Sequence, residues 1–283
     1  MPAVTLALFF RKVIKMSIKV VIASHKPSKF PGDKMYLPLQ MGAAKAVAEG
    51  KNRFATGDDM GTNISDKNPL YSELTGLYYA RYNLFEDYLG LVHYRRYFGK
   101  HKMMHKHGDW RDNVLTTSIA EDIFKNSDVI VPTKRRYFVL TLYSHYSKTH
   151  DASHLELTKQ IVSRRYPSYM AHLDGVYSRT WGYMFNMCIM KRELLIRYCD
   201  WLFPILEELE TMIDTERMDA FNKRLYGRVS EILFNVWIDY MIEHENLRIS
   251  ELPVISPEPI NWAKKLNNFF NALFLGEKYK ESV

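Results

Sequence analysis

The fold is decided by the stretch Ile18-Lys-Val-Val-Ile-Ala23, which is followed at once by the polar loop Ser24-His25-Lys26-Pro27. A short β-branched run that stops at such a loop is typical of a buried strand. Tyr88 to His93 and Asp128 to Pro132 repeat the strand pattern, and Asn68 to Asn83 has helical spacing. This alternation predicts an α/β fold with a mostly parallel sheet flanked by helices, whose ligands bind beyond the carboxyl ends of the strands.

The second half of the chain predicts one more strand and two long helices. Trp181 to Lys191 reads as a buried strand, and Glu193 to Leu209 has the apolar spacing of a helix. The pattern returns from Tyr226 to His244. We therefore expect a helical C-terminal part.

Charge and cysteine content narrow the class of partner. The net charge of +7 suits nucleic acid, an anionic membrane or phosphate-bearing small molecules. The basic residues are scattered and no nucleic-acid-binding motif accompanies them, so we do not expect nucleic acid as a partner. Cys188 and Cys199 lie in apolar surroundings without metal-ligand spacing, which indicates reduced core thiols of a cytoplasmic protein.

The two ends of the chain differ from its middle. The apolar run from Val4 to Phe10 is too short to span a bilayer, and its basic residues follow it, unlike those of a signal peptide. We interpret it as an upstream-start artefact or a membrane-touching extension. From Trp262 to Leu275, large apolar residues at helical intervals accompany two lysines, which predicts a helix in a membrane interface or a last helix docked on the domain.

Two strand ends carry candidate phosphate-binding residues. Ser24, His25 and Lys26 follow the first strand, where backbone amides and a lysine can meet the phosphates of a nucleotide, although polar residues are common in such loops. After Tyr88 to His93 come Arg95 and Arg96, whose forked donors suit a diphosphate. The alternative is a surface arginine pair bonded to structural carboxylates such as Glu73 or Glu86.

The question of a metal stays open. Sugar-nucleotide transferases commonly hold Mn²⁺ or Mg²⁺ with an Asp-x-Asp triplet, and this chain has none. Lys26, Arg95 and Arg96 would then neutralise a departing diphosphate electrostatically. Asp58-Asp59 is the remaining candidate for a divalent metal.

Two carboxylates are candidates for a general base. Glu231 is flanked by apolar residues that raise its pKa if they exclude water, and Asp174 in Ala-His-Leu-Asp-Gly is the second choice. The alternative for each is a structural carboxylate on a helix face or turn. For His145 and His150, which share their segment with His154, we favour an acceptor-binding role over zinc, because the intervals fit one helical face only in part.

Four ordered blocks resemble a known family. They are Asp59-x-Gly61-x-Asn63-Ile-Ser65-x-Lys67-Asn68-x-x-Tyr71-x-Glu73-Leu-Thr75, Gly90-Leu-x-His93-Tyr-Arg-Arg-Tyr-Phe98, Phe185-Asn186-Met-x-Ile-Met190-Lys191 and Ser230-Glu231-x-Leu-Phe-x-Val-Trp237. Over Ile18 to Leu252 the chain is similar to bacterial capsular and exopolysaccharide glycosyltransferases long filed as a domain of unknown function, some of which are galactofuranosyltransferases.

The resemblance implies a GT-A-like, Rossmann-type domain that moves a sugar, with inversion, from a UDP-sugar to a lipid-linked oligosaccharide. It implies donor binding by Asp59, Asn63, Ser65, Lys67 and His93, and acceptor binding by Asn186. We accordingly divide the chain into an extension (1–16), a glycosyltransferase domain (17–252) and an amphipathic segment (253–283), peripheral on the inner face of the cell membrane. The alternative is a non-catalytic nucleotide-sugar-binding scaffold of a polysaccharide assembly complex.

Overall fold

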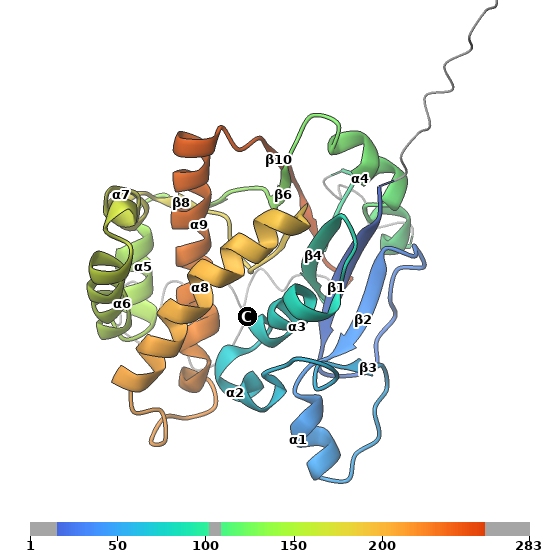
Figure 1. Ribbon diagram of the computed structural model, residues 1–283, viewed down its shortest axis with the longest axis horizontal. Helices are drawn as coiled ribbons and strands as arrows, with labels where there is room; N and C mark the ends of the chain where they lie inside the picture. Colours follow the sequence, from blue (N-terminus) through green and yellow to red (C-terminus); the bar gives the residue numbers. More distant parts are fainter. Residues whose placement is uncertain (1–15, 102–108, 258–283) are drawn as a thin grey trace, which may run out of the picture.

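The computed structural model describes residues 16–101 and 109–257 of the protein (Figure 1). Its centre is a seven-stranded mixed sheet in which only β9 runs against the other strands, so the predicted mostly parallel sheet is confirmed. In spatial order the strands are β10 (Ile249–Leu252), β6 (Val129–Pro132), β9 (Cys188–Lys191), β4 (Tyr88–His93), β1 (Ile18–Ser24), β2 (Tyr36–Gln40) and β3 (Thr56–Gly57).

The alternating side chains of β1 supply both faces of the sheet. Val21 and Ala23 belong to the core on one face, whereas Val20 and Ile22 belong to the core on the other. All four are buried, which explains why the strand reads as a continuous apolar run.

Helices cover the two faces unequally. Residues of α3 (Leu74–Asn83), α8 (Arg192–Met212) and α9 (Leu225–Glu245) belong to the larger core. The smaller core takes residues from α4 (Thr117–Ile123) and from the ribbon of β5 (Tyr97–Phe98) and β11 (Val254–Ile255). The long helices α8 and α9 confirm the helical part that the sequence predicts.

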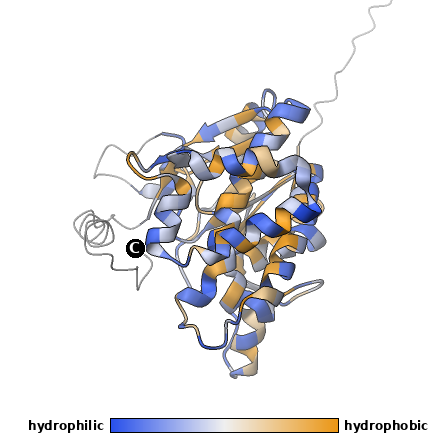
Figure 2. Ribbon diagram, turned by 90° about the vertical axis from the view of Figure 1, so that its left-hand side faces the viewer, coloured by the Kyte–Doolittle hydropathy of each residue, from blue (hydrophilic) through white to orange (hydrophobic). Residues whose placement is uncertain are grey.

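A second group of helices extends the larger core away from the sheet. Figure 1 shows it on the side of α8 and α9 opposite the strands, and α6 contacts α8 while α7 contacts α9. Its members are α5 (Leu142–Thr149), α6 (Ser153–Arg165) and α7 (Met170–Ser178). In Figure 2 the helices carry both hydrophilic and hydrophobic stretches, as expected of helices with one packed face. Within residues 16–101 and 109–257, no helix combines the length and apolar character that crossing a bilayer requires.

The remaining elements are short. They are α1 (Ala43–Ala48), α2 (Asn68–Tyr71), the hairpin of β7 (Arg135–Arg136) with β8 (Trp181–Gly182), and the 3-10 turns η1 (Ser65–Lys67), η2 (Trp110–Asn113), η3 (Pro167–Tyr169) and η4 (Asn222–Arg224).

Two predicted elements are divided in the structure. The helix predicted over Asn68 to Asn83 is split into α2 and α3 at Ser72, whose φ is 53°. The strand predicted from Trp181 to Lys191 becomes β8 and β9, joined by a turn in which Phe185 and Asn186 both have positive φ. Tertiary contacts of these residues, described below, override the local pattern.

The folded body continues past residue 252, since β11 pairs with β5. Both cysteines are buried and free. The predicted interfacial helix from Trp262 to Leu275 and the extension before residue 16 lie outside the described residues, so the proposed division of the chain stays a prediction.

Candidate active site

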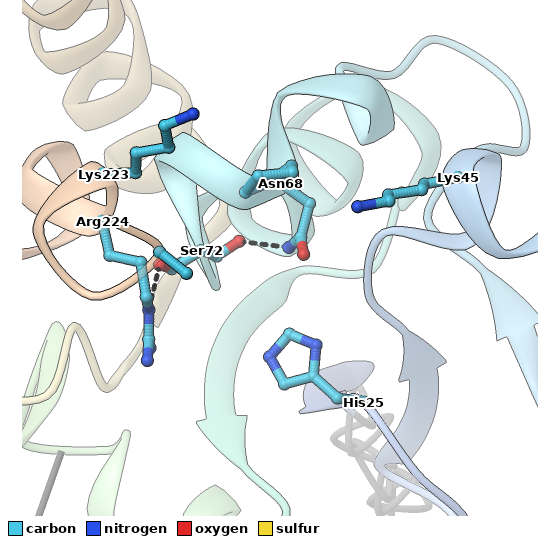
Figure 3. Close-up of a pocket in the computed structure, with 8 residues that line it drawn as sticks. His25, Lys45, Asn68, Ser72, Lys223 and Arg224 are labelled. Atoms are coloured by element: carbon cyan, nitrogen blue, oxygen red, sulfur yellow. Dashed lines mark hydrogen bonds between the residues drawn. The ribbon is translucent and has the colours of Figure 1, made fainter. Parts of the chain in front are cut away.

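A cavity of about 410 Å³ opens beside the carboxyl end of β1. Figure 3 shows Lys45 and Arg224 on opposite sides of the space above His25, with Asn68 and Ser72 between them. Lys223 also lines the cavity, and no carboxylate does. Three cations without an acidic neighbour in the lining make the cavity suited to a polyanion.

The cavity wall is built by the break between α2 and α3. Asn68 Nδ2 donates a hydrogen bond of 2.8 Å to the carbonyl oxygen of Ser72, and Arg224 Nε donates one of 3.0 Å to Ser72 Oγ. These bonds hold Ser72 in a backbone conformation with a φ of 53° and tie the start of α9 to the sheet side. The split of the predicted helix is therefore part of the site.

Asp58 holds the opposite wall. Its fully buried carboxylate accepts bonds from the amides of Gly42 (3.0 Å) and Ala43 (2.9 Å), where α1 begins, and from the hydroxyls of Ser65 and Thr75. These bonds anchor the start of α1, which carries Lys45 to the cavity, and the Lys45 ammonium lies 3.8 Å from Glu49 Oε1.

The candidate metal residues Asp58 and Asp59 both make contacts within the protein. The oxygens of Asp58 are taken by four donors, and Asp59 pairs with Arg53. In the described part of the chain, the group with ligand atoms close enough to share an ion is instead His172, Glu243 and His244, on α7 and α9. Asp59 Oδ1 is buried without a hydrogen-bond partner, so a metal role of the aspartate pair stays a prediction.

Glu231 is the carboxylate with the properties of a base. Burial, followed by the negative charge of Glu73, raises its pKa to about 7, while Arg135, Arg96 and the backbone N–H of Phe185 act in the opposite direction. The sequence-based expectation of a raised pKa thus agrees with the structure. Asp174, by contrast, is exposed on α7, where Lys159 Nζ lies 2.7 Å from its Oδ1, and the structure does not bring it to Glu231.

The turn between β8 and β9 connects the two halves of the site. His93 Nε2 donates to the carbonyl oxygen of Phe185 at 2.6 Å. Asn186 Nδ2 donates to Glu73 Oε1 (2.7 Å) and to the carbonyl oxygen of Gly227 (2.8 Å), and its Oδ1 accepts from Ser230 Oγ (2.9 Å). Because both amide hydrogens are used within the protein, Asn186 positions the turn.

The side chains of the paired arginines lie in different surroundings. Arg96 is largely buried with its guanidinium 4.6 Å from the centre of the Phe185 ring, and burial lowers its pKa against the attraction of Glu231. Arg95 is exposed and lies 5.3 Å from the ring centre of Tyr94, which Lys26 approaches at 5.6 Å. Consecutive residues point in different directions, so Arg95 joins Lys26 outside while Arg96 joins Glu231 inside.

Several predicted donor residues make internal contacts. Ser24 is buried and donates to the carbonyl oxygen of Lys26. Asn63 and Ser65 bond within the loop that carries Asp58, and Lys67 Nζ lies 2.8 Å from Glu210 Oε2. Of the predicted donor residues, His25 alone lines the cavity, and burial followed by the charge of Arg224 lowers its pKa.

The predicted acceptor histidines lie on the helical side. His145 packs against Tyr137 at a ring distance of 4.2 Å, and burial followed by the charge of Arg135 lowers its pKa to about 4, so it is neutral at pH 7. His150 contacts the rings of Tyr146 and Phe221. Both are thus placed among aromatic side chains.

Sequence reasoning missed Lys45, Asn68, Ser72, Lys223 and Arg224 as cavity residues. Asn68 and Ser72 stand inside the quoted motif, and Lys223-Arg224 is a basic pair at the start of a long apolar helix. A pair there gains nothing from the helix dipole, which favours anions at that end. The position of this basic pair was therefore the sequence feature that could have indicated a binding role.

Comparison with known proteins agrees with this architecture. Residues 19–244 match the family model described as a domain of unknown function, DUF4422. The chain belongs to this family. A search of curated proteins finds no match for this DUF4422 member. Among solved structures, it is similar to the apo structure of WbbM, a bifunctional glycosyltransferase, with a TM-score of 0.77 and 28% identity. The match covers 85% of this chain and 45% of the WbbM chain, so this DUF4422 chain spans less than half of that protein.

Proposed function

We propose that this protein is a glycosyltransferase that uses a nucleotide-sugar donor and a glycan acceptor. The observation that carries the proposal is the cation-lined cavity at the carboxyl end of β1. The chain also holds a carboxylate of raised pKa, Glu231, which is not part of the cavity lining. The similarity of the chain to the bifunctional glycosyltransferase WbbM supports the same class of reaction.

The cavity suits the diphosphate of the donor. Lys45, Lys223 and Arg224 reach it from α1 and from η4, while His25 supplies a polar ring at the tip of β1. A diphosphate gains charge as it leaves the sugar, and preorganised cations stabilise that charge at little reorganisation cost. We assign to these residues the role that the sequence suggested for Lys26, Arg95 and Arg96.

Glu231 is the proposed base. In a single displacement, its carboxylate takes the proton of an acceptor hydroxyl, the hydroxyl oxygen attacks the anomeric carbon, and the bond to the diphosphate oxygen breaks with its electron pair on the leaving group. A base with a pKa near the working pH is well matched to this step. The charge of Arg96 favours the ionised form of Glu231.

The finer assignments rest on the family resemblance. On this basis we assign the protein as a GT-A-type, inverting transferase that uses a UDP-sugar, with UDP-galactofuranose as one candidate donor. The acceptor would be a lipid-linked oligosaccharide of capsule, exopolysaccharide or O-antigen synthesis at the inner face of the cell membrane. A panel of UDP-sugars, assayed for UDP release with and without glycan acceptors, tests the donor class.

The decisive variant is Glu231→Gln, compared with Asp174→Asn as a matched control on the other predicted carboxylate. Loss of a general base should lower kcat by about 10²- to 10⁴-fold, whereas Asp174→Asn should leave it unchanged. UDP affinity, measured by calorimetry, should be the same in both. Full turnover by Glu231→Gln would refute the assignment, and tight UDP binding without turnover of any donor would favour a binding scaffold.

A further inference from the structure

One turn exposes two neighbouring apolar side chains. Phe138 and Val139 are 81% and 78% exposed, whereas the other exposed large apolar residues of the described chain stand singly. Single exposed apolar residues are normal on a soluble protein, but an adjacent pair at a loop tip suggests a contact surface.

The turn holds this pair outward. Tyr137 is buried, donates its amide to the carbonyl oxygen of Thr180 at 2.8 Å, and packs against His145. The amide of Val139 bonds the carbonyl oxygen of Tyr137 at 2.7 Å, and Phe138 has a φ of 57°, which is unfavourable for a bulky residue. Packing does not compensate this strain, because the Phe138 ring is in solvent.

Basic residues precede the apolar pair. Arg135 and Arg136 are exposed on β7, and neither forms an ion pair within residues 16–101 and 109–257. Lys134 has Glu251 as a partner at 3.2 Å. The Arg135 guanidinium lies 5.1 Å from the centre of the Tyr137 ring. Guanidiniums without a carboxylate partner, next to exposed apolar side chains, match the chemistry of an anionic bilayer surface, which offers phosphates above hydrocarbon.

We propose that the basic turn, residues 134–139, docks the protein on an anionic phospholipid bilayer. Phe138 and Val139 enter the interface, and Arg135 and Arg136 contact headgroup phosphates. The docking surface lies outside the donor cavity. The docking proposal is independent of the proposed reaction, but docking would affect where the reaction takes place. Arg135 also acts electrostatically on Glu231, so docking brings the proposed base close to the membrane.

The test is vesicle co-sedimentation of the full chain. Wild-type protein should bind vesicles of phosphatidylcholine mixed equally with phosphatidylglycerol, and bind vesicles of phosphatidylcholine alone much less. The double variant Phe138→Ser/Val139→Ser should partition about tenfold more weakly, since two apolar side chains no longer enter the interface. Arg136→Glu should weaken binding to the anionic vesicles alone.

The matched control is Phe85→Ser/Ile242→Ser, which removes two exposed apolar residues elsewhere and should bind as wild type does. Unchanged binding of the Phe138→Ser/Val139→Ser protein would overturn the proposal and assign any membrane affinity to other parts of the chain. Equal binding of wild type to neutral vesicles, or no binding to either kind, would also overturn it. UDP binding by each variant, measured in parallel, separates this outcome from a failure of the proposed reaction.

Discussion

At the scale of single residues, Glu231 shows how burial and charge oppose each other. Arg96 and Arg135 favour its ionised form, but burial and the nearby Glu73 outweigh them, so its pKa rises from 4.5 to about 7. The folded protein therefore binds this proton more tightly than the unfolded chain does. Ionisation of Glu231 costs stability, and the cost appears as pH rises from 4.5 to above 7.

Glu231→Gln should consequently stabilise the protein at pH 8 and have little effect below pH 4.5. The gain is at most about 3.5 kcal/mol, since one pKa unit corresponds to about 1.4 kcal/mol. Urea unfolding of wild type and variant at several pH values measures it. Equal stability differences at low and high pH would contradict the raised pKa.

Residue roles were only partly predictable from the sequence. Apolar neighbours along the chain correctly indicated a raised pKa for Glu231. The sequence does not show where a side chain at a strand end points. Arg95 and Arg96, adjacent in sequence, therefore appear as one group, although they lie in different surroundings. Lys45 and Lys223 come from distant segments, and only the tertiary fold brings them to one cavity.

At the scale of elements, the long apolar patterns were predictable and the short turns were not. The strand β1 and the helices α8 and α9 follow directly from periodicity. The breaks at Ser72 and at Phe185-Asn186 depend on hydrogen bonds with Arg224, Glu73 and His93, which local sequence does not reveal. Both breaks lie at the site, where local preference is commonly overridden.

The element most dependent on one side chain is α1. Asp58→Asn should destabilise the protein by about 2–3 kcal/mol, because an amide group would face donors that now bond a buried carboxylate. The exposed Asp66→Asn is the control and should change stability little. The urea unfolding midpoints of wild type and both variants measure this difference. Equal midpoints for wild type and Asp58→Asn would show that the buried network contributes nothing to stability.

At the scale of the whole molecule, the cavity lies between two bodies of structure. His25 follows a strand of the sheet, whereas Lys223 and Arg224 precede α9 on the helical side. A ligand held by both sides links them, so it stabilises the folded state as a whole.

UDP should therefore slow amide hydrogen exchange at residues 24–28 and at residues 220–226 together. Lys223→Ala should reduce this protection on both sides, whereas Arg217→Ala, an exposed residue of the same connection that does not line the cavity, should not. Exchange measured by mass spectrometry gives the result. Protection confined to one segment would show that the ligand does not bridge them.

The reversed direction of β9 has a consequence for where chemistry enters the molecule. The residues that follow β4 and β6 lie at the edge of the sheet that carries the site. Because β9 is antiparallel to them, the residues at this edge are those that precede it, Phe185 and Asn186. Its last residue, Lys191, lies at the opposite edge and leads into α8. In related chains, functional residues should therefore also be sought in the segment before this strand. Residues that follow strands would not include Phe185, whose backbone bonds both His93 and Glu231.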